Sequence, residues 1–274
     1  MGWLKEMFGT DKPIIALLHL NAFPGDPLFK KGDSMKKTVE DARRDLKALQ
    51  DGGVDGVLFS NEFSLPYQQK IDYIGPAAMA RVIGELMDDI KVPFGIDCEA
   101  DPMAAIDLAA AVEADFIRGL FTGVYAGDDG ITMPDIAAIL RRKKALGLDD
   151  LKMLYFINNE SDEYVVERRL VDIANSTIFD CHPDAFLIMG QYAGQDADSG
   201  SITELREAID VPVLCGTGCN VGNIKEKLDI SDGATVGTTF KKDGKFENHI
   251  EYERVKELMD QVREYRESHE KLEI

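Results

Sequence analysis

The sequence predicts a single (β/α)8 barrel of the TIM type over residues 1–274, because short apolar runs alternate with helical patterns from end to end. Runs that are apolar on both faces and are separated by helices indicate parallel strands covered by helices. Eight such units in about 250 residues match a closed barrel, and the main alternative is a doubly wound open sheet. The strand-like runs are 13–20, 54–60, 93–98, 115–120, 152–157, 185–190, 212–216 and 233–237.

Helices are predicted between these runs from apolar stripes at helical spacing. Ser34 is a suitable N-cap for the first of them, and three of the others carry proline near their start, where its missing N–H costs little. The predicted ranges are 35–50, 76–90, 102–114, 134–146, 165–178, 202–209, 221–228 and 252–265. We expect residues 1–10 to form a short helical plug over one end of the core, and residues 266–274 to form a frayed acidic tail.

Composition and charge narrow the classes of partner. The net charge is −19 and no basic stripe is visible, so neither a nucleic acid nor an anionic membrane is an expected partner. The N-terminal segment is too short and too charged for a signal peptide or a membrane span. The four cysteines form no CxxC motif, which favours a reducing compartment, and we expect a cytoplasmic protein. A homo-oligomer is left open.

The active site of a barrel lies in the loops that follow the strands, and phosphate often binds between the last two of these loops. The sequence has Gly216-Thr217-Gly218 after the seventh strand and Gly237-Thr238-Thr239 after the eighth. Glycine allows backbone N–H groups to approach phosphate oxygens closely, so we predict that these loops bind a small phosphorylated ligand. Alternatively, the glycines only serve tight turns. Lys241 and Lys242 could add charge, but we expect them mainly at the surface.

A dinucleotide site is the weaker interpretation of the seventh loop. Gly216, Gly218 and Gly222 form GxGxxxG, which is one residue longer than the dinucleotide fingerprint, and no acidic residue ends the next strand. Cys215 and Cys219 flank the same loop, and we interpret them as small buried hydrophobic residues rather than as a redox pair.

Acidic residues follow the third strand. Alternation sends Phe94, Ile96 and Cys98 toward the helices, so Asp97 and Glu99 should face the barrel mouth. Together with Glu62 they could bind Mg²⁺ or act as a general acid/base pair. The structural alternative is that Asp97 pairs with Arg118, while Glu99 and Asp101 cap the next helix.

Two further residues at strand ends are candidates for catalysis. His19 is the one histidine of four that is placed at the mouth, where it could carry a proton or simply hydrogen-bond to a carbonyl. Arg118 needs a carboxylate partner or an anionic ligand if it is buried. No lysine ends a predicted strand, which argues against a Schiff-base aldolase.

The chain resembles the BtpA family in the motifs HLNAFPGDP (19–27), VPVLCGTGCNVGNI (211–224) and SDGATVGTTFKKDGK (231–245). The likeness continues in GGVDGV (52–57), GPAAMA (75–80), ADFIRG (114–119) and DDGI (128–131). The family is named for a photosystem I assembly factor, and it includes proteins of bacterial sugar-catabolism operons. The resemblance implies a phosphate-binding TIM barrel. The residues that match the family motifs are His19, Pro24, Gly25, Asn61, Gly216, Gly218, Asn223, Asp232, Gly233, Gly237 and Lys241.

The middle loops depart from the family pattern. Asp97 stands where the family has asparagine, residues 156–161 replace a histidine-rich run, and Met189-Gly190 replaces Thr-Gly. We therefore predict a barrel that binds a phosphorylated metabolite, with a sugar phosphate as the first candidate, and performs lyase or isomerase chemistry on it. The first alternative is a non-catalytic assembly or regulatory protein that retains an anion site. A flavin- or nicotinamide-dependent barrel is the second.

Overall fold

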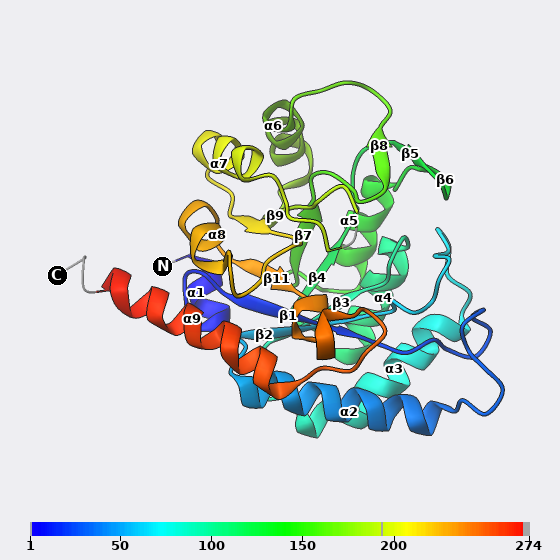
Figure 1. Cartoon of the computed structure of the whole chain (residues 1–274). Coiled ribbons are helices and arrows are strands. Elements are labelled where there is room, and N and C mark those ends of the chain that lie inside the picture. The colour runs from blue at the N-terminus through cyan, green and yellow to red at the C-terminus, as the bar shows by residue number, and fades with distance from the viewer. Residues whose placement is uncertain (1, 193, 271–274) are drawn as a thin grey trace.

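A computed structural model describes residues 2–192 and 194–270, and it shows eight parallel strands closed into a barrel, as predicted (Figure 1). Neighbouring strands follow the order β1-β11-β10-β9-β7-β4-β3-β2 around the barrel. Their bounds are β1 Ile14–His19, β2 Gly56–Ser60, β3 Phe94–Asp97, β4 Phe116–Gly119, β7 Lys152–Phe156, β9 Ala185–Ile188, β10 Val213–Cys215 and β11 Ala234–Val236.

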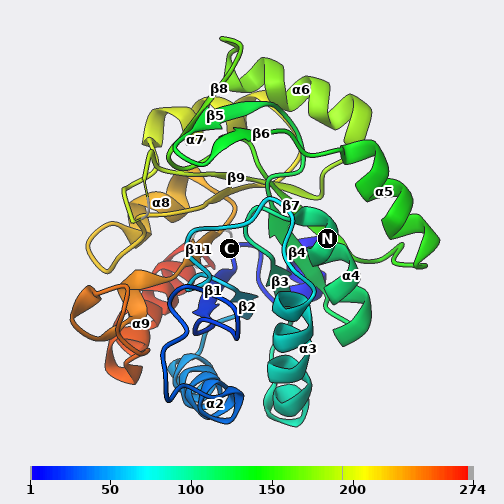
Figure 2. The ribbon, with the colours of Figure 1, turned by 90° about the vertical axis from the view of Figure 1, so that its right-hand side faces the viewer.

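Helices surround the strands, as Figure 2 shows in a view onto one end of the barrel. Ser34 caps the first of them through a hydrogen bond from the amide of Lys37 at 3.3 Å, as predicted. The helix predicted at 165–178 begins five residues later than expected. The bounds of the outer helices are α2 Met35–Gly52, α3 Ile74–Leu86, α4 Pro102–Val112, α5 Ile136–Ala145, α6 Leu170–Cys181, α7 Ser199–Ala208, α8 Ile224–Ile230 and α9 Tyr252–Glu270. Three short 3₁₀ turns lie at Met87–Asp89 (η1), Thr238–Phe240 (η2) and Lys242–Gly244 (η3).

Side-chain alternation along the strands separates two apolar cores. On β1, Ile15 and Leu17 point into the barrel, while Ile14, Ala16 and Leu18 pack against the helices. The N-terminal helix α1 (Trp3–Phe8) lies across the end of the barrel opposite β5 and β6 (Figure 1). Its Leu4 and Phe8 join the interior core, where the Phe8 ring lies 5.6 Å from that of Phe116.

Aspartates that precede four of the strands bind the neighbouring strand at this same end. A carboxylate oxygen of each accepts a hydrogen bond, at 2.7–2.9 Å, from a backbone N–H group at or next to the start of the adjacent strand. The four pairs are Asp55 with Ile14, Asp115 with Phe94, Asp184 with Met153, and Asp232 with Val213. They fix the register of strand pairs at the end of the barrel away from the predicted active site.

A small antiparallel sheet that the sequence analysis did not predict covers part of the opposite end. It consists of β5 (Tyr125–Gly127), β6 (Gly130–Thr132) and β8 (Asp162–Tyr164), which come from the loops after β4 and β7. Tyr125 anchors it to the barrel, because its hydroxyl donates to the carbonyl of Ile157 at 3.3 Å. The loops after two barrel strands are thereby held together above the site.

The C-terminal helix continues into the segment expected to fray. α9 runs to Glu270, and Arg266 within it contacts Asp55 at 2.6 Å, so the start of the predicted tail is anchored. Residues 271–274 lie outside the described part of the chain. Within the described residues, no helix combines the length and the apolar character that a bilayer crossing needs.

We predict that Phe8→Ala lowers the free energy of unfolding by about 3–5 kcal/mol, because it empties a filled position at the closed end of the barrel. Urea denaturation measures the change. Glu6→Ala is the matched control, since Glu6 is exposed on the same helix, and it should change stability by less than about 0.5 kcal/mol. Equal effects of the two substitutions would contradict a packing role for α1.

Candidate functional site

Five predicted residues meet at the C-terminal ends of β1 to β4: His19, Glu62, Asp97, Glu99 and Arg118. Arg118 is central, with a side chain that is only 3% exposed. Its Nε donates to Asp97 Oδ2 at 2.6 Å and its Nη2 to Glu99 Oε1 at 2.9 Å, while Glu62 Oε1 lies 3.5 Å from Nη2. The pairing of Asp97 with Arg118, which the sequence analysis gave as the structural alternative to a metal or acid/base role, is present. We call these five residues the mouth cluster.

Neighbouring groups hold the carboxylates in place. Tyr67 donates its hydroxyl to Glu62 Oε2 at 2.9 Å, and Asn61 Oδ1 accepts the backbone N–H of Glu99 at 2.7 Å. Glu99 therefore does not cap the helix after β3. Asp101 does, because its side chain accepts from the amide of Ala104 at 3.0 Å. The sequence analysis gave capping of this helix by both Glu99 and Asp101 as an alternative, and this is right for Asp101 and wrong for Glu99.

Three carboxylates around one guanidinium cannot all ionise cheaply in a buried site. Burial, reinforced by the charges of Asp97 and Glu62, raises the pKa of Glu99 well above its usual range. Burial also raises the pKa of Asp97, against the opposing effect of Arg118. Although burial opposes the charge on Arg118, the three carboxylates raise its pKa, so the guanidinium stays charged. Of the three carboxyl groups, Glu99 therefore binds a proton most readily, and the charged Arg118 holds the cluster together.

His19 is the member of the mouth cluster with a neutral side chain. Burial lowers its pKa to about 4, and neither ring nitrogen has a hydrogen-bond partner among the described residues. Its Nε2 is 3.9 Å from Glu62 Oε1, which is too far for a hydrogen bond. Gly237 allows the ring to lie close to β11, because a Cβ there would come within 2.9 Å of Nε2. Phe246 covers the ring, with centroids 5.3 Å apart.

Glu160 is a further titratable group at the mouth, and the sequence analysis did not select it. Burial raises its pKa to about 7, partly opposed by Arg118, and its Oε1 is buried without a hydrogen-bond partner. It also interacts with the side chain of Thr217, so it lies between the mouth cluster and the seventh-strand loop. Its position directly after a barrel strand is the signal that could have identified it.

The two loops predicted to bind phosphate flank the cluster, and part of their polar character is used within the protein. Thr217 donates its hydroxyl to the carbonyl of Gln195 at 3.0 Å and accepts the N–H of Gly190 at 2.7 Å. Thr239 donates to the carbonyl of Cys219 at 2.7 Å. Thr238 makes no side-chain hydrogen bond with the described residues. The backbone N–H groups that remain available for a ligand are those of residues 217–218 and 238–239.

Close packing already requires two of the loop glycines. Gly218 has φ +78°, and a Cβ at this position would lie 2.2 Å from Asp196 Cα. A Cβ on Gly216 would lie 2.2 Å from the sulfur of Met189. These contacts account for both glycines without a ligand, so phosphate binding stays a prediction. Cys215 and Cys219 are buried free thiols, in line with their interpretation as small core residues.

The prediction of Mg²⁺ bound by Glu62, Asp97 and Glu99 requires correction. These carboxylates converge on Arg118, so the guanidinium occupies the place where they would share a cation. No group of three or more His, Cys, Asp or Glu side chains among the described residues is arranged to bind a metal ion. The acidic character of this end of the barrel therefore serves to balance Arg118.

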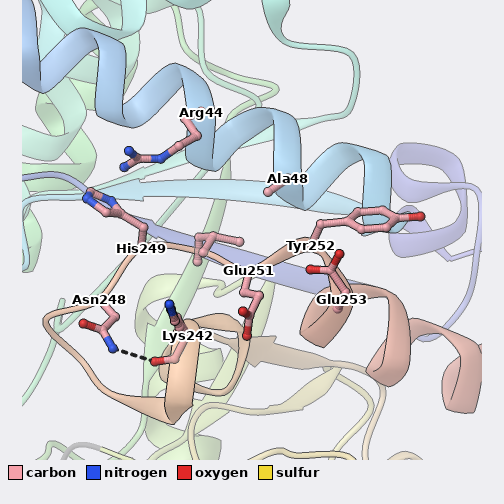
Figure 3. Close-up of a pocket in the computed structure, with 9 residues that line it drawn as sticks. Arg44, Ala48, Lys242, Asn248, His249, Glu251, Tyr252 and Glu253 are labelled. Atoms are coloured by element: carbon pink, nitrogen blue, oxygen red, sulfur yellow. Dashed lines mark hydrogen bonds between the residues drawn. The ribbon is translucent and has the colours of Figure 1, made fainter.

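Lys241 also differs from expectation, because it is buried rather than at the surface. It is 3% exposed, whereas the neighbouring Lys242 is exposed. Lys242 instead lines a cavity of about 440 Å³ on the flank of the barrel, between α2 and the segment before α9 (Figure 3). In that view Asn248 Nδ2 donates to the carbonyl of Lys242 at 2.8 Å, and Arg44 and His249 line the far side. The two lysines thus belong to different environments.

Comparison with known proteins gives a consistent family and fold. The model of the BtpA family matches residues 10–264. The Escherichia coli K12 protein described as putative sgc region protein SgcQ is 45% identical over 267 residues, which cover 97% of this chain and 100% of that protein. Photosystem I biogenesis protein BtpA of Synechocystis is 26% identical, over 95% of this chain and 91% of that protein.

Solved barrels share the fold at low identity. GGGPS from Thermoplasma volcanium has a TM-score of 0.60 at 12% identity, over 96% of this chain and 98% of that chain. N-(5'-phosphoribosyl)anthranilate isomerase from Pyrococcus furiosus has a TM-score of 0.56 at 11% identity, over 92% of this chain and 99% of that chain. At these identities the likeness shows the (β/α)8 fold and nothing of the site.

We predict that Arg118→Met destabilises the protein by about 3–5 kcal/mol at pH 7.5, because it leaves the carboxylates around it without a buried cation. Glu99→Gln is the matched control. The amide resembles a protonated carboxyl, and Glu99 binds a proton most readily of the three, so this variant should stay within about 1 kcal/mol of wild type. Urea denaturation measures the free energy of unfolding of both variants. A loss below about 1 kcal/mol for Arg118→Met would contradict the role of Arg118 in neutralising the surrounding carboxylates.

We predict that Glu160→Gln stabilises the protein at pH 8 by about 1–3 kcal/mol and leaves it nearly unchanged at pH 5. The folded protein keeps the Glu160 proton up to about pH 7, whereas the ordinary pKa is 4.5. The free energy of unfolding therefore falls as pH rises from 4.5 to 7. The loss is about 1.4 kcal/mol for each unit by which the folded and unfolded pKa values differ, and partial exposure of the side chain reduces it. Urea denaturation at both pH values measures the difference, and a pH-independent difference would contradict the raised pKa.

Proposed function

This chain belongs to the BtpA family, and on that premise we propose that it binds a small phosphorylated metabolite, a sugar phosphate, at the mouth of the barrel and transfers protons on it as a lyase or isomerase does. The phosphate would bind the loops at 216–218 and 237–239. The body of the metabolite would lie against Glu160 and the mouth cluster, which includes His19. The expected protein is an enzyme without a bound metal at this site.

The observation that carries this proposal is the pair of unsatisfied proton-carrying groups at the mouth. Both ring nitrogens of His19 and Oε1 of Glu160 are buried without hydrogen-bond partners among the described residues. Each such atom costs about 1–3 kcal/mol unless something satisfies it. A ligand that hydrogen-bonds to both residues would recover this cost, which is the reason to expect one here.

The two groups suit different steps of an acid/base reaction. With a pKa of about 7, Glu160 can accept a proton from carbon and return it to a neighbouring atom at physiological pH. His19 is neutral, so one ring nitrogen can donate a hydrogen bond to a substrate oxygen while the other accepts one. Arg118 is saturated by carboxylates and acts here as a positioning residue.

Two further points support a phosphorylated ligand. Free backbone N–H groups in both loops are the donors that phosphate oxygens need. Barrels of the same fold include N-(5'-phosphoribosyl)anthranilate isomerase and a thiamine phosphate pyrophosphorylase from Pyrococcus furiosus, whose names refer to phosphorylated compounds. Barrels that catalyse different reactions often have a phosphate site in the same place, at the loops after the seventh and eighth strands.

A non-catalytic assembly role is the second candidate, and one observation favours it. The Synechocystis relative is called a photosystem I biogenesis protein, which names no reaction. In this alternative the mouth cluster, whose guanidinium is already neutralised, would only stabilise the barrel. A protein of this kind needs no small ligand at the mouth.

We predict that phosphorylated sugars raise the melting temperature of the protein, while the same sugars without phosphate do not. A ligand at a hundred times its dissociation constant stabilises the folded state by about 2.7 kcal/mol, which a thermal-shift assay detects. The Thr238→Val variant should weaken the shift by removing a free hydroxyl at the eighth-strand loop. Thr132→Val, on β6, is the control. No shift with any phosphorylated sugar would favour the assembly role.

A further inference from the structure

Lys241 differs from the other buried cationic side chains in having no carboxylate partner. Among the described residues these are Arg118, Lys227 and Lys241. Arg118 contacts three carboxylates, and Lys227 Nζ lies 2.7 Å from Asp196 Oδ1. No carboxylate of the described chain lies within 4.0 Å of Lys241 Nζ. A buried charge without a counter-ion is costly, so its retention needs an explanation.

Aromatic rings and one carbonyl enclose this ammonium group. Its Nζ lies 4.9 Å from the ring centroids of both Phe63 and Phe246 and donates a short hydrogen bond to the carbonyl oxygen of Phe246. The same Phe246 ring covers His19. The ammonium is thus at the edge of the mouth, stabilised by weak cation–π contacts and one neutral acceptor.

The charged groups that face Lys241 come from several elements, and they do not neutralise it at contact distance. Asp45 on α2, Glu62 after β2 and Glu247 on the loop after η3 act on it from beyond the salt-bridge range. His19 on β1 is close enough for Lys241 to affect it, and His19 is neutral. Two of the carboxylates have closer partners: Glu62 lies near Arg118, and Asp45 lies beside Arg44 at 3.3 Å.

We infer that Lys241 is the cation that binds the phosphate of the ligand at the eighth-strand loop, an inference that rests on the proposed function. Lys241 follows η2 directly, and its N–H donates to the carbonyl of Thr238, so it is fixed to the loop that contains Thr238 and Thr239. A dianionic oxygen group between this loop and the ammonium would supply the missing counter-ion. The backbone N–H groups would orient the anion, and Lys241 would balance its charge.

This role makes anion binding depend on pH in a defined direction. Burial lowers the pKa of Lys241 to about 8, and Asp45, Glu62 and Glu247 only partly oppose this. A bound anion favours the charged ammonium, so binding above pH 8 must take up a proton. The affinity for an anion that does not itself titrate should then fall as pH rises through 8.

Sulfate is the probe, because it stays dianionic across the range in which phosphate esters titrate. Isothermal titration of the full chain from pH 7.5 to 9.5 should show affinity falling toward tenfold per pH unit above pH 8. All of the proteins compared also carry Glu160→Gln, which removes the carboxyl that titrates near pH 7 and would otherwise contribute to the pH dependence. Lys241→Met should weaken binding at pH 7.5 at least tenfold and abolish the pH dependence.

Two other variants keep the test decisive if Lys241→Met folds poorly. Lys241→Arg retains a charge that does not titrate near pH 8, so it should bind sulfate with a flat pH profile. Lys242→Gln removes the adjacent exposed lysine on the flank cavity and should behave as wild type. Circular dichroism melts establish that each variant is folded.

The outcomes separate this inference from the function on which it rests. If the wild type binds neither sulfate nor phosphorylated sugars, the proposed function fails and the inference fails with it. If the wild type binds sulfate and Lys241→Met or Lys241→Arg keeps the wild-type affinity and pH profile, only the role of Lys241 is overturned. An equal loss in Lys242→Gln would also overturn it, because a general charge effect would then explain the result.

Discussion

The burial of one guanidinium among three carboxylates determines how the upper end of this barrel is built. Arg118 on β4 contacts Asp97 at the end of β3 and side chains from the loops after β2 and β3, so three consecutive strand ends converge on a single charge. Since the carboxylates outnumber the cation, their mutual repulsion and burial raise the pKa of Glu99 well above its usual range. Both ring nitrogens of His19 and Oε1 of Glu160 are then left without hydrogen-bond partners among the described residues.

The opposite end of the barrel uses aspartate in another way. Asp55, Asp115, Asp184 and Asp232 each accept the N–H of a neighbouring strand, and together with α1 they close that end. Three of these residues, Asp55, Asp115 and Asp232, belong to the stretches GGVDGV, ADFIRG and SDGATVG that carry part of the family resemblance. Some of the shared motifs therefore contain residues that hold neighbouring strands together. Their presence reflects a structural requirement and is not evidence about the reaction.

Local patterns predicted the barrel and the strand faces, because alternation and strand-end position are properties of neighbouring residues. They offered the pairing of Asp97 with Arg118 only as one of several alternatives. They could not predict that Lys241 is buried, since one of the two rings that enclose it, Phe63, comes from a segment far away in the sequence. The position of Glu160 after a strand was visible in the sequence, but the burial that raises its pKa was not. The sheet of β5, β6 and β8 joins two loops through long-range pairing. Its strands have three residues each, which is too short for a recognisable alternation pattern in the sequence.

Groups of opposite electrostatic character line the mouth of the barrel. One side gathers Glu62, Asp97, Glu99 and Glu160, while the other presents backbone N–H groups and Lys241. The sequence departures noted above lie on both sides. Asp97 and residues 156–161 belong to the acidic side, whereas Met189-Gly190 contacts the donor loop at Gly216 and Thr217. Under the proposed function, the donor side binds the phosphate and the acidic side contacts the rest of the metabolite. Changes on the acidic side would then alter which metabolite is used, whereas the change at Met189-Gly190 adjoins the phosphate anchor itself.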